Sequence, residues 1–222
     1  MTPAINRTTL LNSYLYRTKG SNYLEIGVRN GENYFAIDAH RKFGVDPNYF
    51  FSKRAILKSL LKKSNWTRRM FRCTSDDFFK FHAPGLLKNR KLDLVFVDGM
   101  HTYEQSLKDG LNSLRFLEPD GIVVFHDCNP WSKESAQPII PTGKVNWNGD
   151  VWKTIYHLRQ YPEYFECFTY DTDEGLGILK RTKEGLDRAI PTISHLSSTK
   201  DMTFEELDKH REEYLGLREV QL

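Results

Sequence analysis

The stretch that decides the fold of this protein reads LDLVFVDGMHTYEQSLKDGLNSLRFLEPDGIVVFHD and covers residues 92–127. Its two ends, 92–98 and 121–127, are nearly continuous apolar runs, which predict strands that are buried on both faces of a sheet. Between them, leucines recur at helical spacing over 103–117, and a turn is predicted over 118–121. A strand, a helix and a strand in this order predict a parallel, right-handed unit.

Weaker patterns extend the same arrangement in both directions. Short strands are predicted over 23–28, 43–46 and 69–73, and helices over 10–16, 32–40 and 52–63. After the central unit, we expect a helix over 152–159, an antiparallel strand pair over 164–170 and 175–180, and a last helix over 203–215. The sequence therefore predicts an α/β fold: a doubly wound, mostly parallel seven-stranded sheet with an antiparallel strand pair near the C-terminus.

The composition is that of a soluble globular protein, with 39% hydrophobic and 27% charged residues. The length predicts one domain over 1–222, with an N-terminal helix in 1–20, a lid-like loop over 128–151 and a helical extension over 196–222. No apolar run approaches the roughly 18 residues of a membrane span, and the N-terminus lacks the apolar stretch of a signal peptide, so we expect a cytoplasmic protein. Three widely separated cysteines without a Cys-x-x-Cys pair favour reduced thiols over disulfides or a zinc site.

The charge is unevenly distributed, although the net charge is only +3. Residues 53–91 carry twelve Lys or Arg against Asp76 and Asp77, a local net charge of +10. At the start of this region, basic and apolar residues alternate over 53–63, which predicts an amphipathic helix with a solvated basic face. Binding of nucleic acid or another polyanion is the alternative, and it is not favoured because aromatic residues interleave too weakly with the basic ones.

Polar residues follow five of the predicted strands, at the edge of the sheet where ligands of such folds bind. The end of the first strand and the turn that follows it carry Glu25-x-Gly27-x-x-x-Gly31, whose glycines let a backbone turn sharply and approach a ligand closely. The spacing differs from the Gly-x-Gly-x-x-Gly of dinucleotide-binding enzymes. Asp46 ends the second strand, where a carboxylate can accept both hydroxyls of a ribose.

The group of polar residues with the most specific chemical signal is Asp98, His101, His126 and Asp127, at the ends of the two central strands. Two acids on adjacent parallel strands can share a divalent cation, and oxygen ligands suit Mg²⁺ or Mn²⁺. An imidazole titrates near neutral pH, so His101 can take a proton from a substrate hydroxyl. A structural role, in which His101 caps a helix and Asp127 anchors a loop, is the alternative reading of the same residues.

Five motifs occur in an order that points to one family. They are YLEIGVRNG at 23–31, GVDP at 44–47, SDDFF at 75–79, VFVDGMHTYE at 95–104 and LEPDGIVVFHD at 117–127. With these motifs the chain resembles the class I S-adenosylmethionine-dependent methyltransferases, which have a Rossmann-like fold. Within them it is similar to a small bacterial branch related to metal-dependent sugar and natural-product O-methyltransferases. The resemblance covers residues 24–180.

The resemblance assigns the two ends of the cofactor to different strand tips. It implies that Asp46 holds the ribose hydroxyls of S-adenosylmethionine. The residues expected at the amino-acid end are Glu25, Gly27 and Gly31, those at the adenine edge are Ser75 and Asp76, and Asp98 is expected beside the cofactor as well.

The resemblance also implies a cation and a base. The expected ligands of a divalent cation, Mg²⁺ or Mn²⁺, are Asp98, His126 and Asp127, and the expected general base is His101. Met100 stands where many relatives have a second acid. The third metal ligand is therefore left open between His126, Glu104 and water.

The expected function is methylation of a hydroxyl on a saccharide or another small-molecule acceptor. The loop over 127–151 would cover that acceptor, with Trp131 and Trp147 available to stack on a sugar or to fill an apolar contact. The alternatives are a nitrogen or phenol acceptor, an NAD-dependent oxidoreductase on a similar sheet, and a non-catalytic module that binds a polyanion through 53–91. The C-terminal helix can pack on its own sheet or on a second copy of the chain, so homo-oligomerisation stays open.

Overall fold

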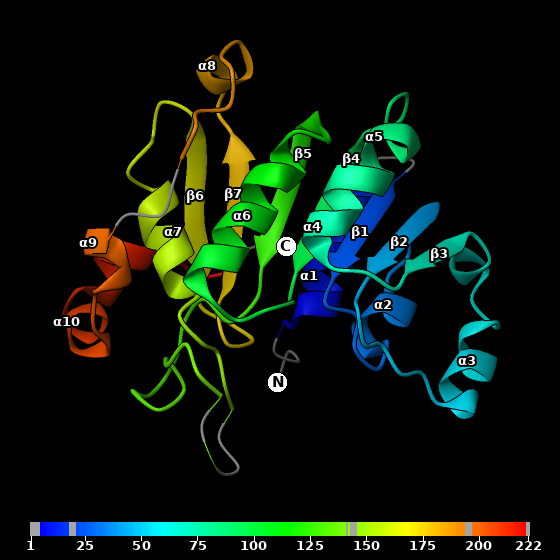
Figure 1. The fold of residues 1–222 in the computed structure, drawn as a ribbon, viewed down its shortest axis with the longest axis horizontal. Coiled ribbons are helices and arrows are strands. Elements are labelled where there is room, and N and C mark those ends of the chain that lie inside the picture. Colours follow the sequence, from blue (N-terminus) through cyan, green and yellow to red (C-terminus); the bar gives the residue numbers. More distant parts are fainter. Residues whose placement is uncertain (1–4, 18–20, 141, 143–145, 194–196, 221–222) are drawn as a thin grey trace.

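A computed structural model describes residues 5–17, 21–140, 142, 146–193 and 197–220. Its centre is an eight-stranded sheet with helices on both faces (Figure 1), in the strand order β3-β2-β1-β4-β5-β7-β6-β8. The strands are β1 Asn22–Ile26, β2 Arg41–Val45, β3 Arg68–Phe71, β4 Leu92–Val97, β5 Leu117–Phe125, β6 Phe165–Tyr170, β7 Leu176–Arg181 and β8 Leu217–Arg218. β7 is antiparallel to β5 and β6, and the other neighbouring strands are parallel. The predicted α/β fold with an antiparallel C-terminal pair is confirmed.

The helices cover the two faces of this sheet in two groups. They are α1 Arg7–Arg17, α2 Glu32–Ala36, α3 Lys53–Ser59, α4 Ser75–Asp77, α5 Ala83–Leu86, α6 Tyr103–Leu114, α7 Trp152–Leu158, α8 Lys183–Leu186, α9 Ser197–Lys200 and α10 Phe204–Leu215, with the 3₁₀ helix η1 Lys63–Asn65 and the π-helix η2 Phe78–His82. Residues of α1 and α2 belong to one apolar cluster, and residues of α5, α6, α7 and α10 belong to the other.

β4 shows how the apolar runs build this layered core. Its side chains alternate between the two clusters: Leu94 and Phe96 belong to the one with α1, while Val95 and Val97 belong to the one with α6. All four are buried. A strand that is apolar on both faces requires helices on both sides, which is the arrangement that the run over 92–98 predicts.

β5 departs most from its prediction. It begins at Leu117, so residues 118–121, which were predicted as a turn, lie within the strand. Leu92 pairs with Leu117 but Leu94 pairs with Ile122, so three additional residues bulge out of β5 between these pairs. Residues 118–120 are exposed, and for this reason turn-forming residues are tolerated inside a strand. A second difference is the eighth strand, β8, which pairs with the end of β6.

The first and last long helices lie near the two ends of the chain. α1 begins at Arg7 and ends at Arg17, while residues 1–4 and 18–20 of the predicted N-terminal helix lie outside the described residues. α10 begins after Thr203, whose side chain and Glu206 form a capping box. In the predicted extension, residues 196 and 221–222 also lie outside the described part. No helix in the described part of the chain is long and apolar enough to span a membrane.

Gly27 is the residue at which the chain leaves β1, and its φ of +88° lies in the left-handed region. A Cβ atom at this position would lie 1.9 Å from the main-chain oxygen of Asp98. We expect Gly27→Ala to lower the free energy of unfolding by about 3 kcal/mol, measured by urea denaturation. Gly85→Ala is the control, because a Cβ at Gly85 meets nothing within 4 Å. An equal loss in both variants would contradict the steric argument.

Candidate functional site

The carboxyl ends of four parallel strands meet at one edge of the sheet. Ile26 at the end of β1 pairs with Val45 of β2 and Val97 of β4, and Val97 pairs with Phe125 of β5. Since Gly27, Asp46, Asp98 and His126 directly follow these paired residues, the register brings together the strand tips at which site residues were predicted.

Two acids and a histidine form a compact group at this edge. His101 Nε2 lies 3.5 Å from Asp98 Oδ1, and His101 Nδ1 lies 3.3 Å from Asp127 Oδ2. One ligand atom from each of the three residues lies within 4.8 Å of the others, a spacing that could hold a metal ion. Asp127 reaches this position with a φ of +62°. The structure thus groups His101 with the two acids, whereas the sequence prediction placed His126 in the ligand set.

His126 lies among three carboxylates next to this group. Its Nδ1 is 2.9 Å from Asp127 Oδ2 and 3.4 Å from Asp98 Oδ1, and its Nε2 is 3.7 Å from Asp173 Oδ1. Burial disfavours the imidazolium, but the carboxylates outweigh it and hold the pKa of His126 well above its usual range. Burial likewise opposes ionisation of Asp98, and the two histidines outweigh it and keep the pKa of Asp98 well below its usual range.

Arg7 and Asp173 belong to the site although the sequence prediction missed both. Arg7 comes from α1 and donates to Asp173 through Nε at 2.9 Å and Nη2 at 2.8 Å, while its Nη1 lies 3.4 Å from Asp98 Oδ2. Asp173 lies in the turn between β6 and β7, with a φ of +49°. The two residues are separated by 166 positions, so only the sheet topology brings them together. The sequence prediction gave residues 171–174 no role beyond connecting the strands over 164–170 and 175–180.

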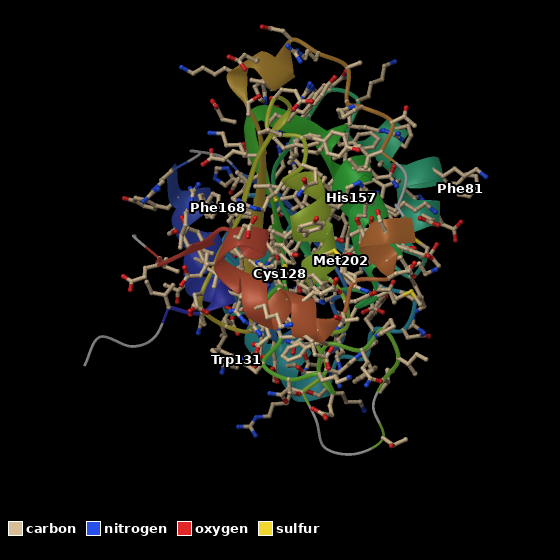
Figure 2. The ribbon with its side chains drawn as sticks, turned by 90° about the vertical axis from the view of Figure 1, so that its left-hand side faces the viewer. Phe81, Cys128, Trp131, His157, Phe168 and Met202 are labelled. Carbon is tan, nitrogen blue, oxygen red and sulfur yellow. The ribbon has the colours of Figure 1, made fainter. Side chains whose placement is uncertain are left out.

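The loop after β5 packs against His101. The carbonyl oxygen of Trp147 lies 2.8 Å from His101 Nδ1, and the two rings stack with centroids 4.9 Å apart. Because a carbonyl only accepts, Nδ1 carries the hydrogen, and Nε2 is the atom left to take up a proton or bind a metal. Asn148 donates to Asp127 Oδ1 at 2.7 Å. Trp131, by contrast, is 71% exposed on the same loop (Figure 2).

On the expected cofactor side, Glu25 is buried at the tip of β1. The Oε2 atom of its carboxyl group accepts hydrogen bonds from the Tyr23 hydroxyl and, at 2.9 Å, from Asn33 of α2. Gly31 precedes α2 with a φ of +83°. Asp46 accepts from the backbone N–H groups of Arg29 and Asn48, both at 2.7 Å, which fixes the orientation of its carboxylate.

The predicted adenine-binding residues lie at the start of α4. Ser75 is buried, and Gln105 of α6 lies with its Nε2 atom 3.2 Å from Ser75 Oγ and 3.3 Å from Asp76 Oδ1. The same amide donates to Asp109 at 3.0 Å, and burial raises the pKa of Asp109 to about 7. The sequence prediction did not include Gln105 or Asp109, because helical residues one turn apart also fit a purely structural role.

Glu25 is expected to make stability depend on pH. Burial raises its pKa to about 8 from an ordinary value of 4.5. Between these values the folded protein keeps a proton that the unfolded chain has released, so stability falls as the pH rises. Relative to Glu25→Gln, the wild-type unfolding free energy should fall by up to about 1.4 kcal/mol per pH unit over this range, measured by urea denaturation. Glu184→Gln, at an exposed position, is the control, and it should track the wild type.

The comparisons with known proteins point to one family. Residues 24–128 match a family model described as a methyltransferase domain. No curated protein sequence matches the chain.

Solved structures share the fold at low sequence identity. The S-adenosylhomocysteine-bound methyltransferase PaMTH1 of Podospora anserina is 16% identical, with a TM-score of 0.53 over 80% of this chain and 78% of that one. The O-methyltransferase TomG of Streptomyces achromogenes, in complex with S-adenosylmethionine, is 14% identical, with a TM-score of 0.55 over 79% of each chain. At such identities the structures show the fold alone, and the match to a methyltransferase domain over residues 24–128 supports the resemblance that the motifs carry.

Proposed function

We propose that this chain, which carries the methyltransferase domain matched over residues 24–128, is an S-adenosylmethionine-dependent O-methyltransferase. Its acceptor is a hydroxyl of a saccharide or of another small molecule, and a divalent cation assists. The observation that carries the proposal is the group of Asp98, His101 and Asp127 at the same sheet edge as Gly27 and Asp46.

The residues at this edge fit S-adenosylmethionine. Asp46 holds its carboxylate in a fixed orientation with two backbone N–H groups, and a carboxylate has further lone pairs for the two ribose hydroxyls. Glu25, Gly27 and Gly31 are the residues for the amino-acid end, and the buried Ser75 with Asp76 for the adenine edge. The TomG and PaMTH1 structures, which hold S-adenosylmethionine and S-adenosylhomocysteine, support this cofactor class.

The side chains that follow β4 and β5 fit a hard divalent cation. Asp98 and Asp127 supply carboxylate oxygens, and a histidine nitrogen completes a set that suits Mg²⁺ or Mn²⁺. Both His101 and His126 approach these acids, so the third ligand is His126, as the sequence suggests, or His101, as the spacing favours. A cation bound here would lower the pKa of an acceptor hydroxyl.

Methyl transfer requires an aligned oxygen nucleophile and removal of its proton. S-adenosylmethionine supplies the methyl group on a sulfonium centre. His101 is the group proposed to accept the proton at Nε2, because the Trp147 carbonyl holds Nδ1 and the stacked indole fixes the ring plane. The loop residues over 146–150 lie directly against His101 and Asp127, where they would limit the access of water.

Calorimetric titration of metal-stripped protein with S-adenosylhomocysteine, repeated with Mg²⁺, tests the proposal. We expect one-to-one binding in the micromolar range, followed by methylation of hydroxyl acceptors in a screen of saccharides and phenols. A change of affinity with Mg²⁺ would place the ion beside the cofactor. Absence of binding under both conditions would refute the methyltransferase assignment, and tighter binding of NAD would favour the oxidoreductase.

A further inference from the structure

The segment that contains α3 exposes the apolar side that its pattern predicts to be buried. Ile56, Leu57, Leu60 and Leu61 recur at a spacing of four residues and form one stripe along α3 and the turn after it. In the structure this stripe faces solvent, with exposed fractions of 70% for Leu57 and 87% for Leu61. Trp66 adds an indole ring that is 67% exposed. A cluster of large exposed apolar side chains on a folded protein marks an interaction surface.

The same segment carries basic residues and no acidic ones. Residues 47–75 contain eight Lys or Arg and no Asp or Glu. Within the described part of the chain, none of the eight pairs with a carboxylate, whereas Lys108, Lys133 and Lys200 elsewhere each form such a pair. The basic residues that are exposed around the apolar stripe are Lys53, Arg54, Lys58 and Lys63. We call these four cations, the stripe and Trp66 the α3 surface.

We propose that the α3 surface docks on the anionic headgroups of a phospholipid bilayer, with Leu57, Leu61 and Trp66 entering the lipid interface. Exposed leucines and a Trp ring flanked by basic residues are the combination that binds anionic membranes. A nucleic acid would neutralise the cations but leave the leucines in water. A second copy of the chain, related by a twofold axis, would place the same unpaired cations against each other.

The α3 surface follows one edge of the sheet. Figure 1 shows α3 beyond the β3 edge, at the same end of the sheet as the loop that follows β5. That loop also carries exposed apolar side chains, among them Trp131 and Ile139. The rest of the α3 surface continues toward the amino end of β3, because Trp66 donates to the carbonyl of Leu60 and lies two residues before Arg68, where β3 begins. The surface proposed to dock therefore runs along the β3 edge of the molecule.

Cosedimentation with vesicles tests the docking without any cofactor, so its result is independent of the proposed methyl transfer. The full chain should bind vesicles of phosphatidylcholine with phosphatidylglycerol and not vesicles of phosphatidylcholine alone. Lys53→Gln with Lys58→Gln should weaken this binding about 30-fold, since two basic side chains are lost at an anionic surface. Leu57→Ser with Leu61→Ser should weaken it about 10-fold or more, because these side chains would no longer enter the interface.

Matched controls distinguish docking through the α3 surface from a general effect of the protein's positive charge and from misfolding of the variants. Lys88→Gln with Arg90→Gln removes two exposed cations near the opposite end of β4, and Phe81→Ser removes one exposed aromatic ring (Figure 2). Both controls should bind like the wild type, and every variant should keep the wild-type melting temperature.

Three results would overturn the proposal. The first is failure of the wild-type chain to bind the anionic vesicles. The second is binding that survives in the Leu57 and Leu61 variant, which would indicate a polyanion site tested next with RNA. The third is a wild-type chain that is a dimer and does not bind vesicles, together with a Leu57 and Leu61 variant that is a monomer. This result would make the surface an interface between two copies of the chain.

Discussion

Replacing Asp98 or Asp127 with asparagine is expected to lower the turnover number for methyl transfer by about 10³-fold or more, with Mg²⁺ and S-adenosylmethionine at saturation. Each carboxylate supplies an oxygen to the proposed cation site, and a bound cation contributes several kcal/mol to stabilising charge in the transition state. Asparagine keeps the shape of the side chain but removes its negative charge. Initial rates with radiolabelled cofactor measure the effect.

The matching control for these two variants is Asp187→Asn, at an exposed position after α8. It should retain wild-type turnover. S-adenosylhomocysteine affinity, measured on the same samples, separates loss of catalysis from loss of cofactor binding. Turnover of Asp98→Asn and Asp127→Asn within a few-fold of the wild type would show that the acids serve the structure and not the reaction.

His101→Ala is expected to lower turnover by about 10² to 10⁴-fold, the usual range for loss of a general base. In the structure, Nδ1 of His101 is committed to the Trp147 carbonyl, and Nε2 lies 3.5 Å from Asp98. The ring is therefore held in one tautomer with one nitrogen available for proton transfer. His210→Ala on α10 is the control, because that ring is half-exposed and pairs with Glu213 and stacks on Tyr214 of its own helix.

The affinity for Mn²⁺ decides which role His101 plays. If it is the base, His101→Ala should bind Mn²⁺ like the wild type while turnover collapses. If it is a metal ligand, Mn²⁺ affinity should fall by more than about 10-fold together with turnover, and His126 becomes the candidate base. Normal turnover in His101→Ala would exclude both roles.

The residues that the sequence placed at the strand tips are the ones that the structure brings to a common edge. Glu25, Gly27, Asp46, Asp98 and Asp127 could be located because apolar runs fix the strands, and the ends of parallel strands lie on one side.

The groups that sequence reasoning missed depend on contacts between distant segments. Arg7 meets Asp173 only because α1 packs beside β4 and the β6–β7 turn ends at the same edge. His126 was expected to be a metal ligand beside Asp98 and Asp127, but its third carboxylate neighbour, Asp173, could not be foreseen because it lies 47 positions away.

Local patterns were less reliable where the surroundings decide the outcome. Residues 118–121 have turn-forming composition, yet in the structure they form a bulge where β5 pairs with β4. The segment over 53–63 has the amphipathic pattern of a helix that buries its leucines, yet its helix ends at Ser59, and Leu57 and Leu61 face solvent.

The sequence by itself determined the α/β class, the order of the strands along the chain, and which residues stand at the carboxyl ends of the strands. Hydrophobic periodicity is a local property, and it fixes which segments must be buried on two faces. Only the tertiary structure decided which charged side chains interact. The ion pairs that Asp98 forms with His126 and Arg7 depend on distances of a few ångströms between separate segments of the chain. The tertiary structure alone also showed that the stripe on α3 has no covering element among the described residues, because burial is a property of the whole fold.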